Sequence, residues 1–220
     1  MTDSGSSPIE TFKVVLLGEM GVGKTSIIAQ FMDQTFQEDL QSSTGGTFSS
    51  KTFTYGGGKL LKFEIWDTAG QERYRSLTTM FYKDANAACL VYDITRKLTF
   101  EEMQNYWVQQ IKENAPKDLI LIIVGNKSDL TDEEEVDEDT ARKFAEDLNA
   151  MFFTTSAKNY SGICDLFIQI AKKYTKADDV QIQNEEDCTN TMKEGDVKKA
   201  GSVKLSKKKS EEKHKKRKCC

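Results

Sequence analysis

A glycine-rich loop between a strand and a helix is the feature that most constrains this chain. Residues 12–17 (FKVVLL) form a mostly apolar run typical of a buried strand, and residues 26–32 have a helical pattern. Between them lies GEMGVGKT (residues 18–25), in which Gly18 and the Gly23-Lys24-Thr25 triplet have the spacing of a phosphate-binding loop. Such a loop turns several backbone N–H groups toward one phosphate. The alternative, a plain glycine turn before a helix, is weakened because both flanking elements are present.

Each residue type in this loop has a chemical reason to be there. Glycines let the backbone curl, and the helix beginning at Lys24 adds its positive N-terminal end. Lys24 supplies a positive charge for the terminal phosphates, and the Thr25 hydroxyl is a ligand for Mg²⁺. The loop therefore predicts a set of nucleotide-binding residues: Gly18, Glu19, Met20, Gly21, Val22, Gly23, Lys24, Thr25 and Ser26.

Strand and helix patterns alternate along the rest of the chain. Two strand-like runs, residues 47–55 and 59–66, flank the turn Gly56-Gly57-Gly58 and predict an antiparallel hairpin. Further strands are expected at residues 87–92, 119–124 and 151–154, and helices at residues 100–113, 139–149 and 163–174. This order predicts an α/β fold in three layers: a mostly parallel six-stranded sheet with one antiparallel edge hairpin and helices on both faces.

A second polar segment, WDTAGQE at residues 66–72, follows the hairpin's second strand. Asp67 ends an apolar strand, which is the place for a carboxylate that assists Mg²⁺. The backbone N–H of Gly70 is free to approach the outermost phosphate, and Gln71 is able to orient an attacking water. Taken alone, the segment equally fits a strand that ends in a turn, but behind a phosphate loop that alternative is weaker.

A third segment, NKSD at residues 126–129, follows the fully apolar strand LILIIV and addresses the base. The Asp129 carboxylate is suited to accept hydrogen bonds from N1–H and the 2-amino group of guanine, a pair of donors that adenine lacks. An ordinary polar loop with an Asx turn is the alternative. The position at a strand's carboxyl end favours ligand binding. The predicted base-pocket residues are Asn126, Lys127, Asp129, Ser156, Ala157 and Lys158.

The character of the chain changes after Tyr174. The last 46 residues contain no Phe, Tyr or Trp and no long apolar run, so they bury too little surface to offset the entropy of ordering. We therefore expect a polar N-terminal lead over residues 1–10, one domain over residues 11–176 and a disordered tail over residues 177–220. Residues 198–220 carry eleven Lys and Arg against two Glu, whereas residues 1–197 have a net charge of −13.

The end of the tail combines basic clusters with two cysteines. Residues 207–209 and 213–218 are mostly basic, and Cys219 and Cys220 close the chain. Stable membrane anchoring needs two signals, which two adjacent lipidated cysteines would supply, and lysines add attraction to an anionic membrane leaflet. A nuclear localisation signal or a nucleic-acid patch is the alternative. The tail has no aromatic residue on which bases could stack.

These segments together make residues 11–176 similar to the Ras superfamily of small GTPases, and in particular to the Rab family. The Rab-like features are WDTAGQERYRSL at residues 66–77, VYDIT at residues 91–95 and the terminal Cys219-Cys220. A terminal CaaX box is absent, since Arg217 stands fourth from the end. Phe36 matches the aromatic residue that packs against guanine in this family.

The resemblance implies a GDP/GTP switch that regulates vesicle-mediated membrane trafficking and hydrolyses GTP slowly with Mg²⁺. Lys24 and Gln71 would be catalytic, and Thr25, Ser43 and Asp67 would hold the metal. The implied partners are an exchange factor, a GTPase-activating protein, a prenyl-carrying chaperone and effectors, with no nucleic acid. The protein is expected to be a monomer on the cytoplasmic face of an intracellular membrane, with a cytosolic pool, and to be prenylated on Cys219, Cys220 or both.

Two positions depart from the family pattern. Met20 stands where Rab proteins usually have a small residue, and its long side chain either crowds the γ-phosphate site or bends outward harmlessly. In the segment that the resemblance implies is the first switch, about residues 34–49, ungapped alignment gives Ser43 as the Mg²⁺ ligand, whereas a slip of one residue gives Thr44. Met20 motivates an alternative function, a GTP-binding module that recruits effectors with impaired hydrolysis. A P-loop ATPase or nucleotide kinase is a further alternative, against which the NKSD segment argues.

Overall fold

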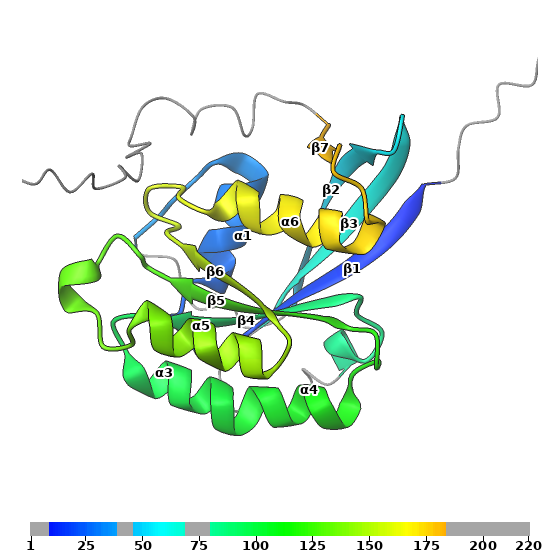
Figure 1. Cartoon of the computed structure of the whole chain (residues 1–220). Coiled ribbons are helices and arrows are strands. Elements are labelled where there is room, and N and C mark those ends of the chain that lie inside the picture. The colour runs from blue at the N-terminus through cyan, green and yellow to red at the C-terminus, as the bar shows by residue number, and fades with distance from the viewer. Residues whose placement is uncertain (1–8, 39–45, 69–79, 184–220) are drawn as a thin grey trace, which may run out of the picture.

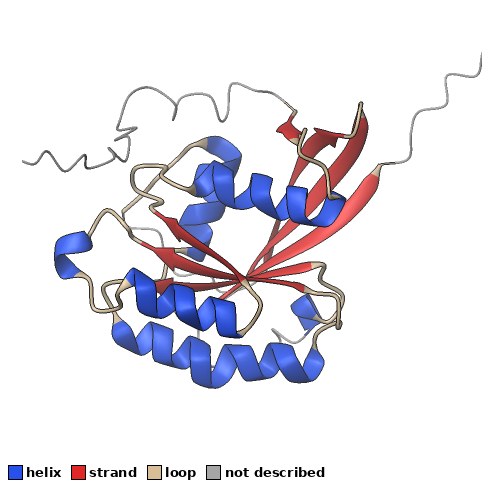
Figure 2. Ribbon diagram, viewed as in Figure 1, coloured by secondary structure: helices blue, strands red, loops and turns tan. Residues whose placement is uncertain are grey.

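A computed structural model describes residues 9–38, 46–68 and 80–183 of the chain. A seven-stranded sheet runs through the domain in the order β6-β5-β4-β1-β3-β2-β7, and helices lie on both of its sides (Figures 1 and 2). The strands are β1 (Glu10–Leu17), β2 (Thr47–Tyr55), β3 (Lys59–Asp67), β4 (Ala87–Asp93), β5 (Ile120–Asn126), β6 (Met151–Thr155) and β7 (Gln181–Ile182). The predicted three-layer α/β fold is therefore confirmed.

Most strand pairs in the sheet are parallel. β1 pairs with β3 and β4, β4 with β5, and β5 with β6, all in parallel, whereas β2 runs antiparallel to β3. β4 is buried along its whole length, as its run AACLVYD requires for a strand covered on both faces. Because β1, β4, β5 and β6 are parallel, their carboxyl ends meet at one edge of the sheet, where open α/β sheets bind ligands.

The helices divide between the two faces. α1 (Lys24–Asp33) and α6 (Ile163–Thr175) cover one face, over a core that includes Phe12, Phe31 and Phe167. The other face is covered by α5 (Glu138–Asp147) and by the continuous run of α3 (Lys97–Glu102), the π-helical turn η2 (Met103–Trp107) and α4 (Val108–Asn114). A short 3₁₀ turn, η3 (Thr131–Glu133), precedes α5. Within the described ranges, no helix is both long enough and apolar enough to cross a lipid bilayer.

The prediction of six strands with a disordered segment from residue 177 is wrong at its boundary. β7 adds a seventh strand antiparallel to β2, pairing Phe53 with Ile182, so β2 is not the edge of the sheet. The physical reason is local, because Val180 and Ile182 are buried in the core cluster that also contains residues of β2 and α6. At the other end of the domain, β1 already begins at Glu10, inside the predicted N-terminal lead.

Candidate functional site

The predicted phosphate loop connects β1 to α1 and depends on its glycines. Gly18, Gly21 and Gly23 have φ of 145°, 79° and 96°, in the region that side chains rarely adopt. Space is equally restricted: a Cβ atom on Gly18 would lie 2.2 Å from the carbonyl oxygen of Val91, and one on Gly23 would lie 2.2 Å from Nδ2 of Asn126. The loop thus packs closely against the ends of β4 and β5, and this packing restricts its backbone conformation.

Lys24 begins α1 and is 5% exposed. Its Nζ donates to the carbonyl oxygens of Gly18 at 2.8 Å and Glu19 at 2.9 Å, so the side chain crosses the loop that precedes it. Burial lowers the pKa of Lys24 to about 8, although the charges of Asp67 and Glu19 oppose this shift. A buried cation next to a helix N-terminus favours an anionic ligand, and a phosphate would restore the charge that burial disfavours.

Thr25 and Asp67 place side by side two oxygen atoms that are suited to bind a metal ion. The Thr25 hydroxyl donates to Oδ2 of Asp67 at 2.6 Å, and this contact joins the start of α1 to the end of β3. A hydroxyl and a carboxylate are the hard oxygen ligands that Mg²⁺ prefers. The donor chemistry therefore fits the predicted metal site at Thr25 and Asp67.

The base pocket is built by the loops after β5 and β6. Asn126 is buried; its Nδ2 donates to the carbonyl oxygen of Val22 at 2.8 Å, and its Oδ1 accepts from the Thr155 hydroxyl at 3.0 Å. The Ser156 hydroxyl donates to Oδ1 of Asp129 at 2.5 Å. These bonds hold the phosphate loop and the two base loops against one another, and they orient the Asp129 carboxylate.

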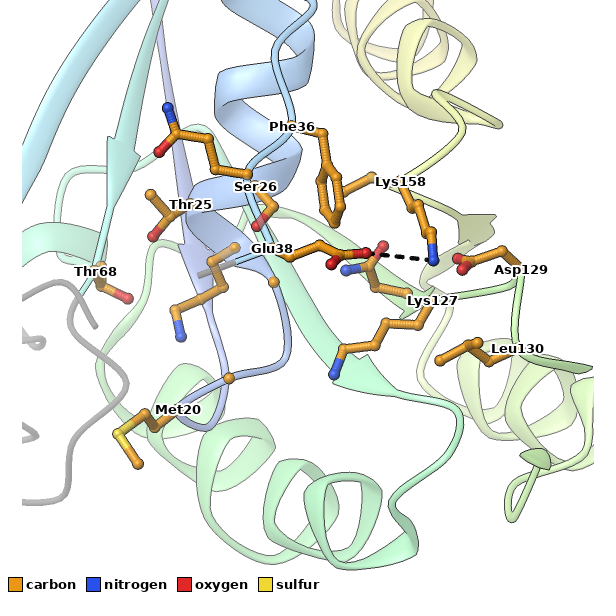
Figure 3. A pocket seen from close by; sticks show the side chains of 16 residues that line it. Met20, Thr25, Ser26, Phe36, Glu38, Thr68, Lys127, Asp129, Leu130 and Lys158 are labelled. Atoms are coloured by element: carbon orange, nitrogen blue, oxygen red, sulfur yellow. Dashed lines mark ion pairs between the residues drawn. The ribbon is translucent and has the colours of Figure 1, made fainter. Parts of the chain in front are cut away.

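These elements enclose one pocket of about 330 Å³. Figure 3 shows Asp129, Leu130 and Lys158 grouped at one end and Thr25 and Thr68 at the other. Of the predicted residues, those that line the pocket are Met20, Gly21, Gly23, Lys24, Thr25, Ser26, Phe36, Asn126, Lys127, Asp129, Ala157 and Lys158. The others that the structure describes, Gly18, Glu19, Val22, Asp67 and Ser156, are not among its lining residues.

The pocket also contains residues that the sequence patterns did not single out. Gln37, Glu38, Thr68 and Leu130 line it, and Oε1 of Glu38 forms an ion pair with Nζ of Lys158 at 3.6 Å (Figure 3). Leu130 follows NKSD directly, so an apolar residue next to the base motif was the available signal. Glu38 had no such signal, because it lies in a polar stretch without periodicity.

Several predicted residues lie outside the described ranges. These are Ser43 and its alternative Thr44, Gly70, Gln71, Cys219 and Cys220. Thr68 is the last described residue before Gly70 and Gln71, and its hydroxyl donates to the carbonyl oxygen of Leu16 at 2.6 Å. This bond fixes the direction in which the chain leaves β3.

A buried carboxylate, Asp93, joins two parts of the site and was also missed. Its Oδ2 binds Nζ of Lys127 at 2.6 Å and Nε of Arg96 at 3.0 Å, and its side chain is fully buried. Burial alone would raise the pKa of Asp93, but hydrogen bonds from Lys127 and Thr95 hold it below its usual value. The sequence signal was a carboxylate at the end of a buried strand, the same signal that identified Asp67.

An aromatic cluster lies on the surface beside the site. The rings of Phe48 and Trp66 are 5.4 Å apart, those of Trp66 and Phe81 are 5.6 Å apart, and Phe48 is 49% exposed. Phe48 lies just after residues 39–45 and Phe81 just after residues 69–79. An exposed aromatic patch of this kind is typical of a protein interaction surface.

Comparison with known proteins agrees with this geometry. A sequence model of the Ras family matches residues 13–176. The chain is 43% identical over 170 residues to the Ras-related protein Rab-22A of Mus musculus, which covers 77% of this chain and 87% of that protein. It is 42% identical over 170 residues to the Ras-related protein Rab-31 of Rattus norvegicus, covering 77% and 86% of the two chains. The Ras-related protein RabJ of Dictyostelium discoideum is 42% identical over 161 residues, covering 73% and 62%.

Proposed function

Because the chain belongs to the Rab family of the Ras superfamily of small GTPases, we propose that its pocket runs a Mg²⁺-dependent GDP/GTP cycle with the residues described above. As a family member it binds guanine nucleotide, hydrolyses GTP and acts in membrane trafficking. The relatives do not favour the alternative of a GTP-binding module with impaired hydrolysis. The proposal is carried by one observation: buried Lys24, Thr25 with its bond to Asp67, and the Asp129 carboxylate come together at one pocket, which Lys24, Thr25 and Asp129 line.

The nucleotide is oriented by the two ends of the pocket. Phosphates bind at the start of α1, where Lys24 exchanges its bonds to loop carbonyls for bonds to phosphate oxygens. Guanine binds at the other end, between Phe36 and Lys158, with Asp129 accepting from its N1–H and 2-amino groups. Asn126 and Lys127 fix the loop after β5 in place, because Asn126 donates to the Val22 carbonyl and Lys127 pairs with Asp93.

Thr25 and Asp67 would hold Mg²⁺, with Ser43 as the third proposed protein ligand and Thr44 as its alternative. When bound, the ion neutralises charge on the phosphate oxygens. The existing contact between Thr25 and Asp67 keeps both oxygens together before any ligand arrives. The support for this assignment is the donor set itself, since hydroxyl and carboxylate oxygens are suited to a small hard cation.

In hydrolysis, a water oriented by Gln71 attacks the γ-phosphorus while the bond to the β-phosphate oxygen breaks, releasing phosphate and GDP. Lys24 and the loop N–H groups, with that of Gly70, stabilise the charge that develops on the phosphate oxygens. Because the γ-phosphate is present in one state only, its contacts to Ser43 and Gly70 distinguish the GTP form from the GDP form.

Single-turnover phosphate release from GTP-loaded protein tests this assignment. Gln71→Leu is expected to slow release at least tenfold, because the water loses its orienting group. Gln109→Leu, an exposed position on α4, is the matched control and should leave the rate unchanged. Equal rates for the two variants would contradict the role of Gln71.

Base recognition is tested by Asp129→Asn. An amide at this position donates a hydrogen bond where guanine also donates, so GTP binding should weaken at least a hundredfold. Xanthine carries a carbonyl in place of the 2-amino group of guanine, and this carbonyl accepts a hydrogen bond from the amide. Binding of xanthosine triphosphate should therefore rise. Asp132→Asn, in the exposed turn η3, should change neither affinity, and unchanged GTP affinity in Asp129→Asn would overturn the assignment.

Met20 is one of the two positions at which the chain departs from the family pattern. Its side chain is 50% exposed at the tip of the phosphate loop. We propose that it slows phosphate release by crowding the approach to the γ-phosphate. Met20→Ser should then release phosphate faster than the unchanged protein, and equal rates would show that Met20 is a bystander.

We further propose that the protein is anchored to the cytoplasmic face of an intracellular membrane through prenylated Cys219 and Cys220, with a chaperone-bound cytosolic pool. One lipid chain gives only marginal binding, so two are needed. After enzymatic prenylation, protein with both cysteines should sediment with phosphatidylserine vesicles. Cys219→Ser or Cys220→Ser should bind weakly, and the double variant should remain in solution. Equal sedimentation of all forms would contradict the proposal.

Effectors and regulators are proposed to contact the aromatic cluster of Phe48, Trp66 and Phe81. Phe48 is exposed, Trp66 and Phe81 are half-buried, and Phe48 and Phe81 follow closely in sequence on residues 39–45 and 69–79, which hold the proposed γ-phosphate contacts. A partner that covers the cluster would therefore be placed to sense the state of the nucleotide. Phe48→Ala should reduce the binding of partners that select the GTP form. Leu98→Ala, which is 74% exposed on α3, is the matched control. A larger loss in the Leu98 variant would contradict this assignment.

A further inference from the structure

Arg96 lies against the outside of the phosphate loop, although 76 residues separate it from Met20 in the sequence. It occupies the turn between β4 and α3. Its Nη2 donates to the carbonyl oxygen of Met20 at 3.1 Å and lies 3.5 Å from the position that a Cβ atom on Gly21 would take. The guanidinium therefore binds Met20 and leaves no more than van der Waals space beside Gly21 at the tip of the loop.

The guanidinium is held in one orientation from its other side. Nε of Arg96 donates to Oδ2 of the fully buried Asp93 at 3.0 Å, and the Arg96 N–H donates to the Asp93 carbonyl oxygen at 3.0 Å. Asp93 is fixed in turn, because its Oδ1 accepts from the N–H of Thr95 at 3.0 Å and from the Thr95 hydroxyl at 2.7 Å. A planar guanidinium with one edge on Asp93 directs its other edge at the loop.

This contact has a consequence for the peptide between Met20 and Gly21. In a trans peptide the carbonyl and the N–H lie in one plane and point in opposite directions, and no described residue forms a cis bond. With the Met20 carbonyl turned out toward Arg96, the Gly21 N–H is turned the other way. Gly21 and Lys24 both line the pocket, so an N–H turned away from Arg96 is placed to serve its phosphate end. A cation on the carbonyl also polarises the peptide and strengthens the N–H as a donor.

We propose that Arg96 is a positioning residue for the nucleotide, which acts through the Met20–Gly21 peptide by aiming and polarising the Gly21 N–H toward a phosphate oxygen. The inference rests on the proposed phosphate role of the loop. It concerns binding of both GDP and GTP, and it assigns Arg96 no direct contact with the substrate.

Asp93 extends the effect to the base end of the pocket. Its Oδ2 binds Nζ of Lys127 as well as Arg96, so one buried carboxylate supports a cation behind each of the two loops. Loss of Arg96 leaves the contact between Asp93 and Lys127 in place. Base selectivity should therefore persist in an Arg96 variant while phosphate binding weakens.

The test uses the full-length chain loaded with GDP and Mg²⁺. Arg96→Ala should release GDP about tenfold faster, the loss expected for one charge-assisted hydrogen bond. It should also shift the ³¹P resonances of bound GDP, a signal that a purely structural role would not move. Arg96→Lys retains the charge without the planar fork, so its release rate should be intermediate. Lys97→Ala removes a neighbouring cation that pairs with Glu101 on the surface, and it should behave as the unchanged protein.

Several outcomes would overturn the inference. A lower melting temperature with unchanged ³¹P resonances in Arg96→Ala would make Arg96 a structural residue only. If Arg96→Ala fails to fold, unchanged release and resonances in Arg96→Lys would overturn it equally. Lys24→Ala separates this failure from that of the proposed function. If Lys24→Ala binds GDP as well as the unchanged protein does, the phosphate role of the loop itself is refuted. If Lys24→Ala loses GDP binding while Arg96→Ala releases GDP at the unchanged rate, only the Arg96 inference is refuted.

Discussion

The phosphate loop at residues 18–25 and the hairpin turn at residues 56–58 both place glycines at positive φ, and the two segments differ in what surrounds them. A Cβ atom on Gly18 would meet the Val91 carbonyl at 2.2 Å, whereas one on Gly57 would meet nothing within 4 Å. In the hairpin turn, Asp179 accepts from the N–H of Gly56 at 3.0 Å and of Gly57 at 3.3 Å. The N–H groups of the hairpin turn thus bind a carboxylate of their own chain, whereas those of the phosphate loop are proposed to bind a nucleotide.

Glycine spacing alone therefore does not make a phosphate site. The phosphate loop is followed by the ten-residue helix α1 and contacts a buried lysine, and the ends of β4 and β5 press on it. The hairpin turn joins two strands, lies in solvent and has no such support. A ligand site therefore needs a cation, a helix end and rigid neighbours in addition to a flexible backbone.

Gly18→Ala should have the largest effect, because φ of 145° and the Val91 carbonyl leave no room for a methyl group. We expect a loss of more than about 3 kcal/mol in the free energy of unfolding, together with loss of nucleotide binding. Gly57→Ala has backbone strain without a clash, so it should cost only about 1 kcal/mol. Denaturant unfolding measures both losses, and equal losses would show that the packing around Gly18 adds nothing to the cost of backbone strain.

Asn126→Ala tests the polar contacts that press on the loop. The change leaves the Val22 carbonyl and the Thr155 hydroxyl without a partner that they now have in the core, which should cost about 2 kcal/mol. GDP release should accelerate as well. Asn114→Ala removes an exposed amide that bonds to Gln110, and its effect should stay within about 0.5 kcal/mol. A smaller loss for Asn126 than for Asn114 would refute the structural role of this amide.

Asp179→Asn examines the hairpin turn itself. Its carboxylate is exposed, and the bonds to Gly56 and Gly57 hold its pKa below the usual value. Water replaces these bonds readily, so global stability should hardly change while amide hydrogen exchange at the two glycines becomes faster. Asp178→Asn is the matched control. Unchanged exchange at Gly56 and Gly57 in the Asp179 variant would show that the carboxylate does not protect them.

The smallest effect is a pH dependence at the hairpin end of the sheet. Glu10 accepts from the hydroxyls of Tyr174 at 2.5 Å and Tyr55 at 2.8 Å, and the bond to Glu10 raises the pKa of Tyr174 to about 12. Since the folded-state pKa is raised, the stabilisation is complete below the ordinary tyrosine value of 10.0 and is lost as pH rises through about 12. Glu10→Gln should move the tyrosinate absorbance of Tyr174 to lower pH. Glu113→Gln should not, and identical titrations would contradict the interpretation.

The sequence predicted the parts of this molecule whose residue types have few alternative uses. Gly18, Lys24 and Thr25 stand between a strand and a helix, so their place at a sheet edge followed from local order. Asp129 could be placed in the same pocket because parallel strands carry their following loops to one edge. The apolar runs of β4 and β5 likewise predicted buried central strands.

The rest depended on contacts between segments far apart in the chain. The alternation Val180-Gln181-Ile182 is too short to predict a strand by itself, and these residues form one because they pair with β2 and join the core. Arg96 looks like any charged residue at the start of a helix until the fold brings it to Met20. Patterns in one sequence report periodicity and residue chemistry, whereas these contacts arise from the three-dimensional arrangement.

The short strand β7 also determines which contacts would break first if the chain were pulled at residue 184. Tension applied through residue 184 reaches the sheet first at Gln183, whose N–H donates to the Thr52 carbonyl at 3.0 Å. The next load falls on the pairing of Ile182 with Phe53 and of Gln181 with Thr54, and only afterwards on α6. Because these few contacts would break one after another, β7 would separate from β2 before the rest of the sheet carries the load. Several residues of the chain would then be released before a pull at residue 184 strained the pocket at the carboxyl ends of the parallel strands.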